Sequence, residues 1–446
     1  MKRATAGALL ALTLVFAACK ADDKSPQSAP APVRDTVRIG VWMSPEPGGA
    51  TYGGAATRTL IYPQLFRATP GGGWAADVIE PGSDRTAANG KSARLKLRAN
   101  ARWSDGTRIT VDDLRRTMDT RFVTAVESPT SVGTIVLRFT QALPGWRRLW
   151  SGLDVIAPPK EGVYGGPYTL GPVTTGLETV LLRNERYYGT RPAIREVHLV
   201  LAPDPEIATR LMERGELDVI APPAFSARTA RLRRVKNAQV LVGRSDKGGW
   251  TAAIVANPSR LAKDQRVALL SLVDRKRFTD VLLRGEATAA GPSTASVAPA
   301  PTSQAVPSLG APVEAPQLAL MLQAMQRLGR ERGFTFELRQ AEFGQVLGAY
   351  ARSDFDALVR LQPGSPTRCW TCELGSVNPA LAAAADAGDR GAADQLRGQL
   401  VDDALVLPLW RERPVVAVRD GLEGVTPNGF AASGPAWNIA AWRWSS

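Results

Sequence analysis

The residues that could do nucleophilic or metal chemistry are few in this chain. Of its 446 residues only one is a histidine, His198, and three are cysteines, Cys19, Cys369 and Cys372. His198 lies in an alternating stretch at 196–201 that predicts a β-strand, so any Ser-His-Asp or Cys-His site would depend on a strand residue. The Cys and His residues do not have the spacing of a zinc site. The sequence therefore predicts a protein that is not an enzyme and that holds neither a metal nor another cofactor.

Length and charge narrow the class of protein further. The chain is 44% hydrophobic and 22% charged, and its 446 residues are too many for one ordinary core. Its formal net charge is +13, but the cations are spread along the chain and form no long run. We therefore expect two lobes or domains and no binding of nucleic acid.

The N-terminus predicts export. Two cations precede an uncharged apolar run at 4–18 that ends in small residues, which is typical of a secretory signal peptide over residues 1–18. The sequence VFAAC, which ends at Cys19, resembles a bacterial lipobox and implies that this cysteine is acylated and anchors the protein to a membrane. Plain secretion with a free thiol is the alternative. Residues 19–35, rich in Ala, Ser and Pro, predict a tether.

Periodic stretches predict the elements that would position a site. Period-two patterns predict strands at 36–42, 94–98, 135–139, 179–182, 217–219 and 335–338. Two helix starts carry capping signals, because Thr110 with Asp113 resembles a capping box and Asp204 precedes Pro205. Further helices are expected at 317–330 and 391–405. Strands that alternate with capped helices favour α/β layers.

Two further stretches carry specific expectations. The helix that begins at Pro205 is expected to bury Ile207, Ala208, Leu211 and Met212. Residues 287–313 contain five prolines and no charged residue, and they predict an irregular segment.

Six short motifs stand in a fixed order along the chain. They are WSDGT with TVDDL at 103–114, GGPY at 165–168, LRNERYYG at 182–189, GELD at 215–218, DQRV with VDR at 264–275, and VLPLW at 406–410. Each motif alone is weak, since turns with Asp-Gly are common. Their order resembles that of the family 5 extracytoplasmic solute-binding proteins, which are the dipeptide, oligopeptide and nickel receptors of ABC importers.

The resemblance implies a two-lobed α/β fold of the periplasmic-binding-protein type (type II). Lobe 1 would comprise 36–243 and 411–446, and lobe 2 would comprise 244–410. The chain would cross the hinge twice, near Trp250 and near Pro408. Closure of the lobes around a solute is a hinge motion that importer subunits can sense.

The same resemblance implies a function and its partners. The protein would be an extracytoplasmic monomer, anchored to a bacterial membrane, that captures peptides or peptide-like solutes. It would deliver them to the permease and ATPase subunits of an importer. The alternative is a lipoprotein that kept the scaffold but lost import and acts as a sensor or cell-envelope scaffold.

Candidate ligand residues follow from the resemblance as well. Trp370 and Glu373 stand where peptide-binding relatives carry a tryptophan and an acidic residue that pairs with the amino terminus of the peptide. Aromatic residues near the crossings or on segments that should face the cleft complete the candidates: Trp42, Tyr52 and Trp250.

The pair Cys369 and Cys372 has three interpretations. In an oxidising compartment it would form a local disulfide. Redox exchange through a C-x-x-C motif and two reduced thiols are the alternatives.

Overall fold

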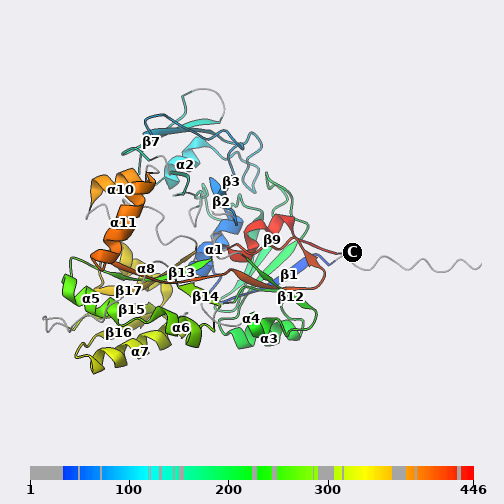
Figure 1. Ribbon diagram of the computed structural model, residues 1–446. Coiled ribbons are helices and arrows are strands. Elements are labelled where there is room, and N and C mark those ends of the chain that lie inside the picture. The colour runs from blue at the N-terminus through cyan, green and yellow to red at the C-terminus, as the bar shows by residue number, and fades with distance from the viewer. Residues whose placement is uncertain are drawn as a thin grey trace, which may run out of the picture. The chain divides into compact units, whose positions relative to one another are not determined.

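The computed structural model describes residues 34–48, 51–70, 73–118, 120, 122–129, 133–143, 146–148, 150, 155–222, 229–243, 249–284, 286–289, 306–313, 316–363, 378–386, 389–428 and 433–445. They form two large β-sheets, one four-stranded sheet and two small ribbons, with helices packed on the sheets (Figure 1). This arrangement confirms the prediction of an α/β fold. In the part of the chain that is described, no helix is both long and apolar enough to span a membrane.

The first large sheet has seven strands in the order β12-β19-β11-β1-β10-β9-β8. Its central strand β1 pairs in parallel with β10 on one side and with β11 on the other. The strands of this sheet are β1 (Thr36–Val41), β8 (Tyr168–Thr174), β9 (Glu178–Arg183), β10 (Glu196–Leu201), β11 (Val219–Ile220), β12 (Ala238–Val242) and β19 (Val415–Arg419). The accompanying helices are α1 (Tyr52–Ile61), α3 (Pro205–Glu213) and α4 (Thr229–Leu232).

The second large sheet has six strands in the order β14-β18-β13-β17-β15-β16. These are β13 (Trp250–Ala256), β14 (Ala287–Ala289), β15 (Ser308–Pro312), β16 (Glu337–Ala341), β17 (Ala357–Pro363) and β18 (Val406–Glu412). Helices cover both of its faces, since alternate residues of β13 pack into two different apolar cores. One face carries α5 (Lys263–Ser271), α6 (Arg275–Leu282) and α7 (Pro316–Glu331), and the other carries α8 (Phe343–Ala351), α10 (Pro379–Asp386) and α11 (Arg390–Asp402) (Figure 1).

A separate apolar core belongs to the segment between α1 and β8. It holds the four-stranded sheet β4-β5-β7-β6 together with α2, whose Leu114 is fully buried. The remaining elements are β2 (Phe66–Ala68), β3 (Trp74–Ala76), β4 (Arg85–Thr86), β5 (Ser92–Lys96), α2 (Val111–Thr117), β6 (Val123–Glu127), β7 (Thr134–Phe139), the 3-10 turns at Trp146–Arg148 and Gly434–Ala441, β20 (Leu422–Glu423) and β21 (Arg443–Trp444).

The chain passes from one large sheet to the other twice, through a link after β12 and a link after β18. Within them the backbone N–H of Gly243 donates to the carbonyl oxygen of Pro414 at 2.8 Å. A Cβ on Gly249 would lie 1.6 Å from the carbonyl oxygen of Glu412, so only glycine allows this approach. The second link lies at Arg413 and Pro414, whereas Pro408 lies inside β18.

The GELD motif builds a buried ion pair under the first sheet. Gly215 ends α3 with a φ of +83°. Asp218, 0% exposed, accepts from the backbone N–H of Arg38 at 2.9 Å. Its second oxygen lies 3.2 Å from Nε of Arg419. The motif therefore joins β1 and β19, the two neighbours of β11.

The DQRV and VDR motifs attach two helices to the second sheet. Arg266, at 7% exposure, donates to the carbonyl oxygens of Leu261 and Asp403 at 2.7 and 2.8 Å. Arg275, also at 7% exposure, donates to the carbonyl oxygen of Pro408 at 2.9 Å. Burial lowers the pKa of both guanidinium groups. These motifs hold α5 and α6 against the segment that contains β18.

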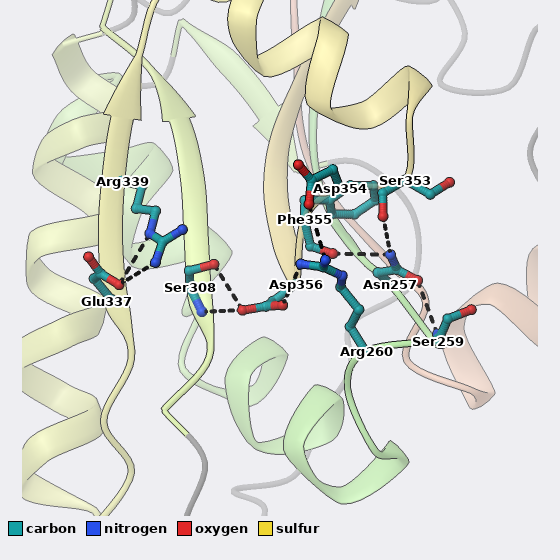
Figure 2. Close-up of polar contacts among 10 residues, drawn as sticks. All are labelled: Asn257, Ser259, Arg260, Ser308, Glu337, Arg339, Ser353, Asp354, Phe355 and Asp356. Carbon is teal, nitrogen blue, oxygen red and sulfur yellow. Dashed lines mark hydrogen bonds and ion pairs between the residues drawn. The ribbon is translucent and has the colours of Figure 1, made fainter.

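A polar network closes one end of the second sheet (Figure 2). Asp356 accepts from both the backbone N–H and the hydroxyl of Ser308 at 2.9 Å, which fixes β15 beside β17. The side-chain amide of Asn257 donates to the carbonyl oxygens of Ser353 and Phe355 at 3.0 and 3.1 Å. The strand order of this sheet is thus fixed by side chains as well as by the ladder.

Two predictions from the sequence are wrong in detail. Residues 287–289 and 308–312 form strands, so the expected irregular segment over 287–313 is wrong at both ends. Pairing of β15 with strands on both sides outweighs the weak strand propensity of its small residues. Ile207 is 44% exposed, because α3 turns the face with Ala208 and Met212 toward the sheet.

Candidate ligand-binding site

A cavity of about 110 Å³ lies between segments of the two large sheets. Its walls come from the ends of β1 and β11, the start of α1, the start of β13 and the link from β18 to β19. The residues from these segments are Val41, Trp42, Met43, Gly53, Ala56, Ala221, Pro222, Trp250 and 412–416. Asn428 and 433–435 complete the lining.

The position of the cavity follows from the topology of the first sheet. The next strands of this sheet along the chain, β8 to β10, lie on one side of β1, and after α3 the chain enters β11 on the other side. Ligands of open α/β sheets bind outside the carboxyl ends of the strands at such a switch point. Trp42 and Met43 at the end of β1, and Ala221 and Pro222 at the end of β11, line the cavity there.

Two tryptophans from different sheets meet in this wall. Trp42 directly follows β1 and Trp250 begins β13, and both side chains are half-buried. Their ring centroids lie 5.6 Å apart with an interplanar angle of 74°, which is an edge-to-face contact. The two indoles therefore form one aromatic patch of the cavity wall, to which both sheets contribute.

Polar groups in the lining are few. Glu412 is 9% exposed, and Arg413 is exposed. Asn428 is 4% exposed and donates through Nδ2 to the carbonyl oxygen of Ala68 at 2.9 Å. An apolar lining with a few placed polar groups is typical of a ligand pocket. Among the described residues, the lining contains neither histidine nor cysteine, and no group of side chains could hold a metal ion.

The structure brings together part of the set that the sequence predicted. Trp42 and Trp250 both line the cavity. Tyr52 begins α1, directly before the lining residue Gly53, but the placement of its side chain is not described. Four predicted residues lie outside the described residues: Cys369, Trp370, Cys372 and Glu373. The lipid-attachment candidate Cys19 lies outside them as well.

The single histidine is a strand residue, as predicted. His198 lies in β10, and its Nδ1 lies 2.8 Å from Oε1 of Glu178. Its Nε2 lies 2.7 Å from Oε1 of Glu196. The imidazole is thus held by two carboxylates on the first sheet and does not line the cavity.

Sequence reasoning missed Glu412, Arg413, Asn428 and Gly53. The first two follow the VLPLW motif, and a charged pair directly after an apolar strand is the signal that could have found them. A Cβ on Gly53 would lie 2.3 Å from the carbonyl oxygen of Ser44, so this glycine lets α1 start against the segment after β1.

A second groove lies elsewhere on the six-stranded half. It measures about 530 Å³ between α6 and α7, where Val281 and Leu320 are 65% and 48% exposed. This groove lies between two helices on one face of the sheet, away from the ends of parallel strands. The smaller cavity is therefore the better candidate for the ligand site.

Comparison with known proteins gives a family and a fold. Residues 153–319 match the model of the bacterial extracellular solute-binding proteins, family 5 (middle region). A search of curated proteins finds no match.

Three solved structures illustrate the fold. The oligopeptide-binding protein AppA from Bacillus subtilis, in complex with a nonapeptide, is 14% identical with a TM-score of 0.73, over 93% of this chain and 100% of that chain. AgaA from A. tumefaciens R10, in complex with agropinic acid, is 16% identical with a TM-score of 0.76, over 92% and 99%. A dipeptide-binding protein from Pseudoalteromonas sp. SM9913, in complex with Met-Leu, is 14% identical with a TM-score of 0.74, over 92% and 100%.

These findings confirm the predicted fold, and over residues 153–319 they bear out the resemblance to family 5 that the order of the motifs indicates. The neighbouring structures are type II periplasmic binding proteins, and they cover nearly the whole chain. The matched family and these neighbours are binding proteins, not enzymes. Over residues 153–319 the chain is similar to the family 5 extracellular solute-binding proteins, and its fold is that of the solved binding proteins.

Proposed function

We propose that this protein is the solute receptor of an ABC importer and that it captures peptides or peptide-like solutes in the cavity between the two large sheets. One observation carries the proposal. The cavity lies at the topological switch point of the first sheet, and Trp42 and Trp250 flank it from different sheets. Flat, amphipathic indole rings suit a ligand that combines apolar side chains with polar main chain.

The bound molecules of the structural neighbours support this class of ligand. They include a nonapeptide and the dipeptide Met-Leu, beside agropinic acid and a nickel–histidine complex. The cavity lining offers no imidazole to a metal chelate. It offers apolar surface with a carboxylate and a guanidinium, which suits a peptide-like zwitterion better.

The lobes of this receptor would be 36–243 with 411–446, and 244–410. The membership of the strands supports the division, because β1 and β8–β12 share one sheet with β19, while β13–β18 form the other. The hinge would consist of the links 243–249 and Arg413–Pro414, at which the chain passes from one sheet to the other. A link of a few residues can absorb the change in φ and ψ when lobes close.

The receptor would work outside the cytoplasm as a lipid-anchored monomer beside the permease and ATPase. Acylation of Cys19 and the tether at 19–35 would place it there. Metabolic labelling with an alkynyl fatty acid should mark the wild type and leave Cys19→Ser unlabelled. Equal labelling of both would exclude this anchor, and a secreted, unlabelled wild type would support plain export.

Native mass spectrometry tests the ligand class. The chain with Cys19→Ser is exported in a bacterium, purified without denaturation and weighed before and after unfolding. A set of extra masses that resolve into peptides would support a peptide receptor. A single non-peptide mass would mean that the ligand is not a peptide. Protein without any bound mass from several media would favour the sensor or scaffold role.

Variants of the two tryptophans test the site itself. Trp42→Ala and Trp250→Ala should each weaken binding of the copurified solute by about tenfold or more, since each removes one aromatic wall. Trp74→Ala is the matched control, because Trp74 is 37% exposed in β3 and does not line the cavity. Equal solute affinities in all three variants would mean that the ligand site lies elsewhere in the molecule.

A further inference from the structure

Glu286 bonds two segments that belong to different sheets. It lies between α6 and β14 of the six-stranded half, and its carboxylate oxygens accept from the backbone N–H of Thr229 at 3.0 and 3.2 Å. Oε2 also accepts from the hydroxyl of Thr229 at 2.8 Å. Thr229 is the first residue of α4, in the segment between β11 and β12 of the seven-stranded sheet.

Both ends of this contact adjoin walls of the ligand cavity. Directly after Glu286, β14 pairs with β18 so that Ala287 stands opposite the lining residue Glu412. On the other side, the chain that leads to Thr229 leaves β11 through Ala221 and Pro222, which also line the cavity. The carboxylate therefore joins the six-stranded half, next to the strand pair that holds Glu412, to the segment that follows Ala221 and Pro222 in the chain.

We propose that Glu286 is a positioning residue of the binding site, and that its bonds to Thr229 form a non-covalent third link beside the two chain links of the hinge. This inference rests on the proposed function, because it assigns the link a role in closure around a solute. The link holds the two walls at the spacing that encloses the cavity, and it opens when the lobes open.

The geometry of the hinge makes the bonds sensitive to rotation. The links 243–249 and Arg413–Pro414 lie on the chain path between the sheets, whereas Glu286 and Thr229 lie on neither link. A rotation about the links that displaces the two residues by about 1 Å removes hydrogen bonds of 2.8–3.2 Å. Bonds that form in one arrangement of the lobes and not in another shift the equilibrium toward the first.

The test uses Glu286→Gln, Thr229→Val and the double variant in the full chain. We expect each single variant to shift the ligand-free protein toward the open state by about tenfold, as the loss of charge-assisted hydrogen bonds predicts. Small-angle scattering should report a larger radius of gyration, and hydrogen exchange of the Thr229 amide should be faster. Thr229→Val removes the hydroxyl bond but keeps the backbone N–H, and Glu286→Gln keeps one acceptor oxygen. The double variant should therefore show a shift smaller than the sum of the two single shifts, because both changes weaken the same link.

A matched control separates this role from a merely structural one. Thr288→Val removes the hydroxyl bond from Thr288 to the carbonyl oxygen of Arg411 at 3.3 Å, which stays within the six-stranded sheet. It should leave scattering, exchange at Thr229 and solute affinity at wild-type values. Solute affinity should fall about tenfold in Glu286→Gln and Thr229→Val, with an unfolding midpoint like that of the control.

Two results would overturn the inference. Unchanged scattering and exchange in both single variants would mean that the bonds do not bias the lobes. A change that Thr288→Val reproduces, together with a lower unfolding midpoint in all variants, would mean a general loss of stability. If the wild type binds no solute at all, the proposed function fails, but scattering and exchange of the ligand-free variants still decide whether the link exists.

Discussion

The two large sheets hold their buried charged groups in different ways. In the seven-stranded sheet, Nε of Arg419 lies 3.2 Å from the carboxylate of Asp218, which is 0% exposed. In the six-stranded half, Arg266 and Arg275 donate to backbone carbonyl oxygens of segments beside β18. The Asp218 carboxylate neutralises the charge of Arg419, which also donates to the carbonyl oxygens of Met212 and Leu217. Carbonyl dipoles by themselves solvate a charge without neutralising it. Mutations at these charged groups should therefore lower the free energy of unfolding by different amounts in the two halves.

The largest effect is expected at the ion pair. Asp218→Ala leaves the Arg419 guanidinium without its buried counter-charge and the backbone N–H of Arg38 without an acceptor, so the free energy of unfolding should fall by about 3–5 kcal/mol. Urea denaturation followed by circular dichroism measures the loss.

The control for this variant is Asp402→Ala, at an exposed position at the end of α11, which should change stability by less than about 0.5 kcal/mol. A loss below about 1 kcal/mol in Asp218→Ala would mean that water reaches Arg419 and that the two sheets do not differ in this way.

A smaller effect is expected at the carbonyl-bound arginine. Arg275→Met removes the charge together with its bond, so this guanidinium charge is not left buried, and the carbonyl oxygen of Pro408 loses a donor. The free energy of unfolding should fall by about 1–3 kcal/mol in the same urea assay. Arg275→Lys keeps one donor and should recover part of the loss. A loss in Arg275→Met as large as that in Asp218→Ala would remove the contrast between the sheets.

The predictable parts of the fold are those with a local physical cause. Asp204 and Pro205 predicted the start of α3, where Asp204 accepts from the backbone N–H groups of Glu206 and Ile207. In α7 a stripe of five residues predicts the buried face: Leu318, Met321, Leu322, Met325 and Leu328. The first four are 0% exposed, and Leu328 is half-buried against the same core.

Features that depend on distant partners were not predictable. The strand at 308–312 owes its place to pairing with residues 337–341 and 357–358 and to the carboxylate of Asp356 (Figure 2). Its own composition, Ser-Leu-Gly-Ala-Pro, gives no strand signal. For the same reason, the sequence suggested the two cavity tryptophans but not Glu412 or Asn428, which reach the cavity only through the way the sheets meet.

A helix cap gives the next smaller effect in the first sheet. Asp204→Ala removes the side-chain acceptor at the start of α3 and should lower the free energy of unfolding by about 1 kcal/mol. Asp204→Asn keeps the acceptor oxygen and should lose only a few tenths of a kcal/mol. Differential scanning calorimetry of both variants checks the order. Equal losses would mean that the charge at the helix start matters more than the hydrogen bond.

The smallest effect concerns surface carboxylates in the two halves. In the six-stranded half, the hydrogen bond from Lys263 at 3.0 Å lowers the pKa of Asp403 below its ordinary value of 3.8. Because the folded pKa lies below the unfolded value, the pair contributes stability above that value and loses it as the pH falls through the folded pKa. Lys263→Met should therefore raise the pKa of Asp403 and flatten the fall of stability in acid, as carboxyl-carbon NMR titration can measure.

The corresponding pair in the four-stranded sheet is the internal control for this titration. There the guanidinium of Arg138 donates to both oxygens of Glu127 at 3.0 and 3.1 Å and lowers the pKa of that carboxyl. Lys263→Met should leave the pKa of Glu127 unchanged. The two surface pairs belong to parts of the molecule with separate cores, so they should act independently. If Glu127 moved together with Asp403, the variant would have disturbed the whole fold, and the two halves would not respond separately to the loss of a charge. An unmoved Asp403 beside an unmoved Glu127 would instead mean that solvent already screens the Lys263 bond.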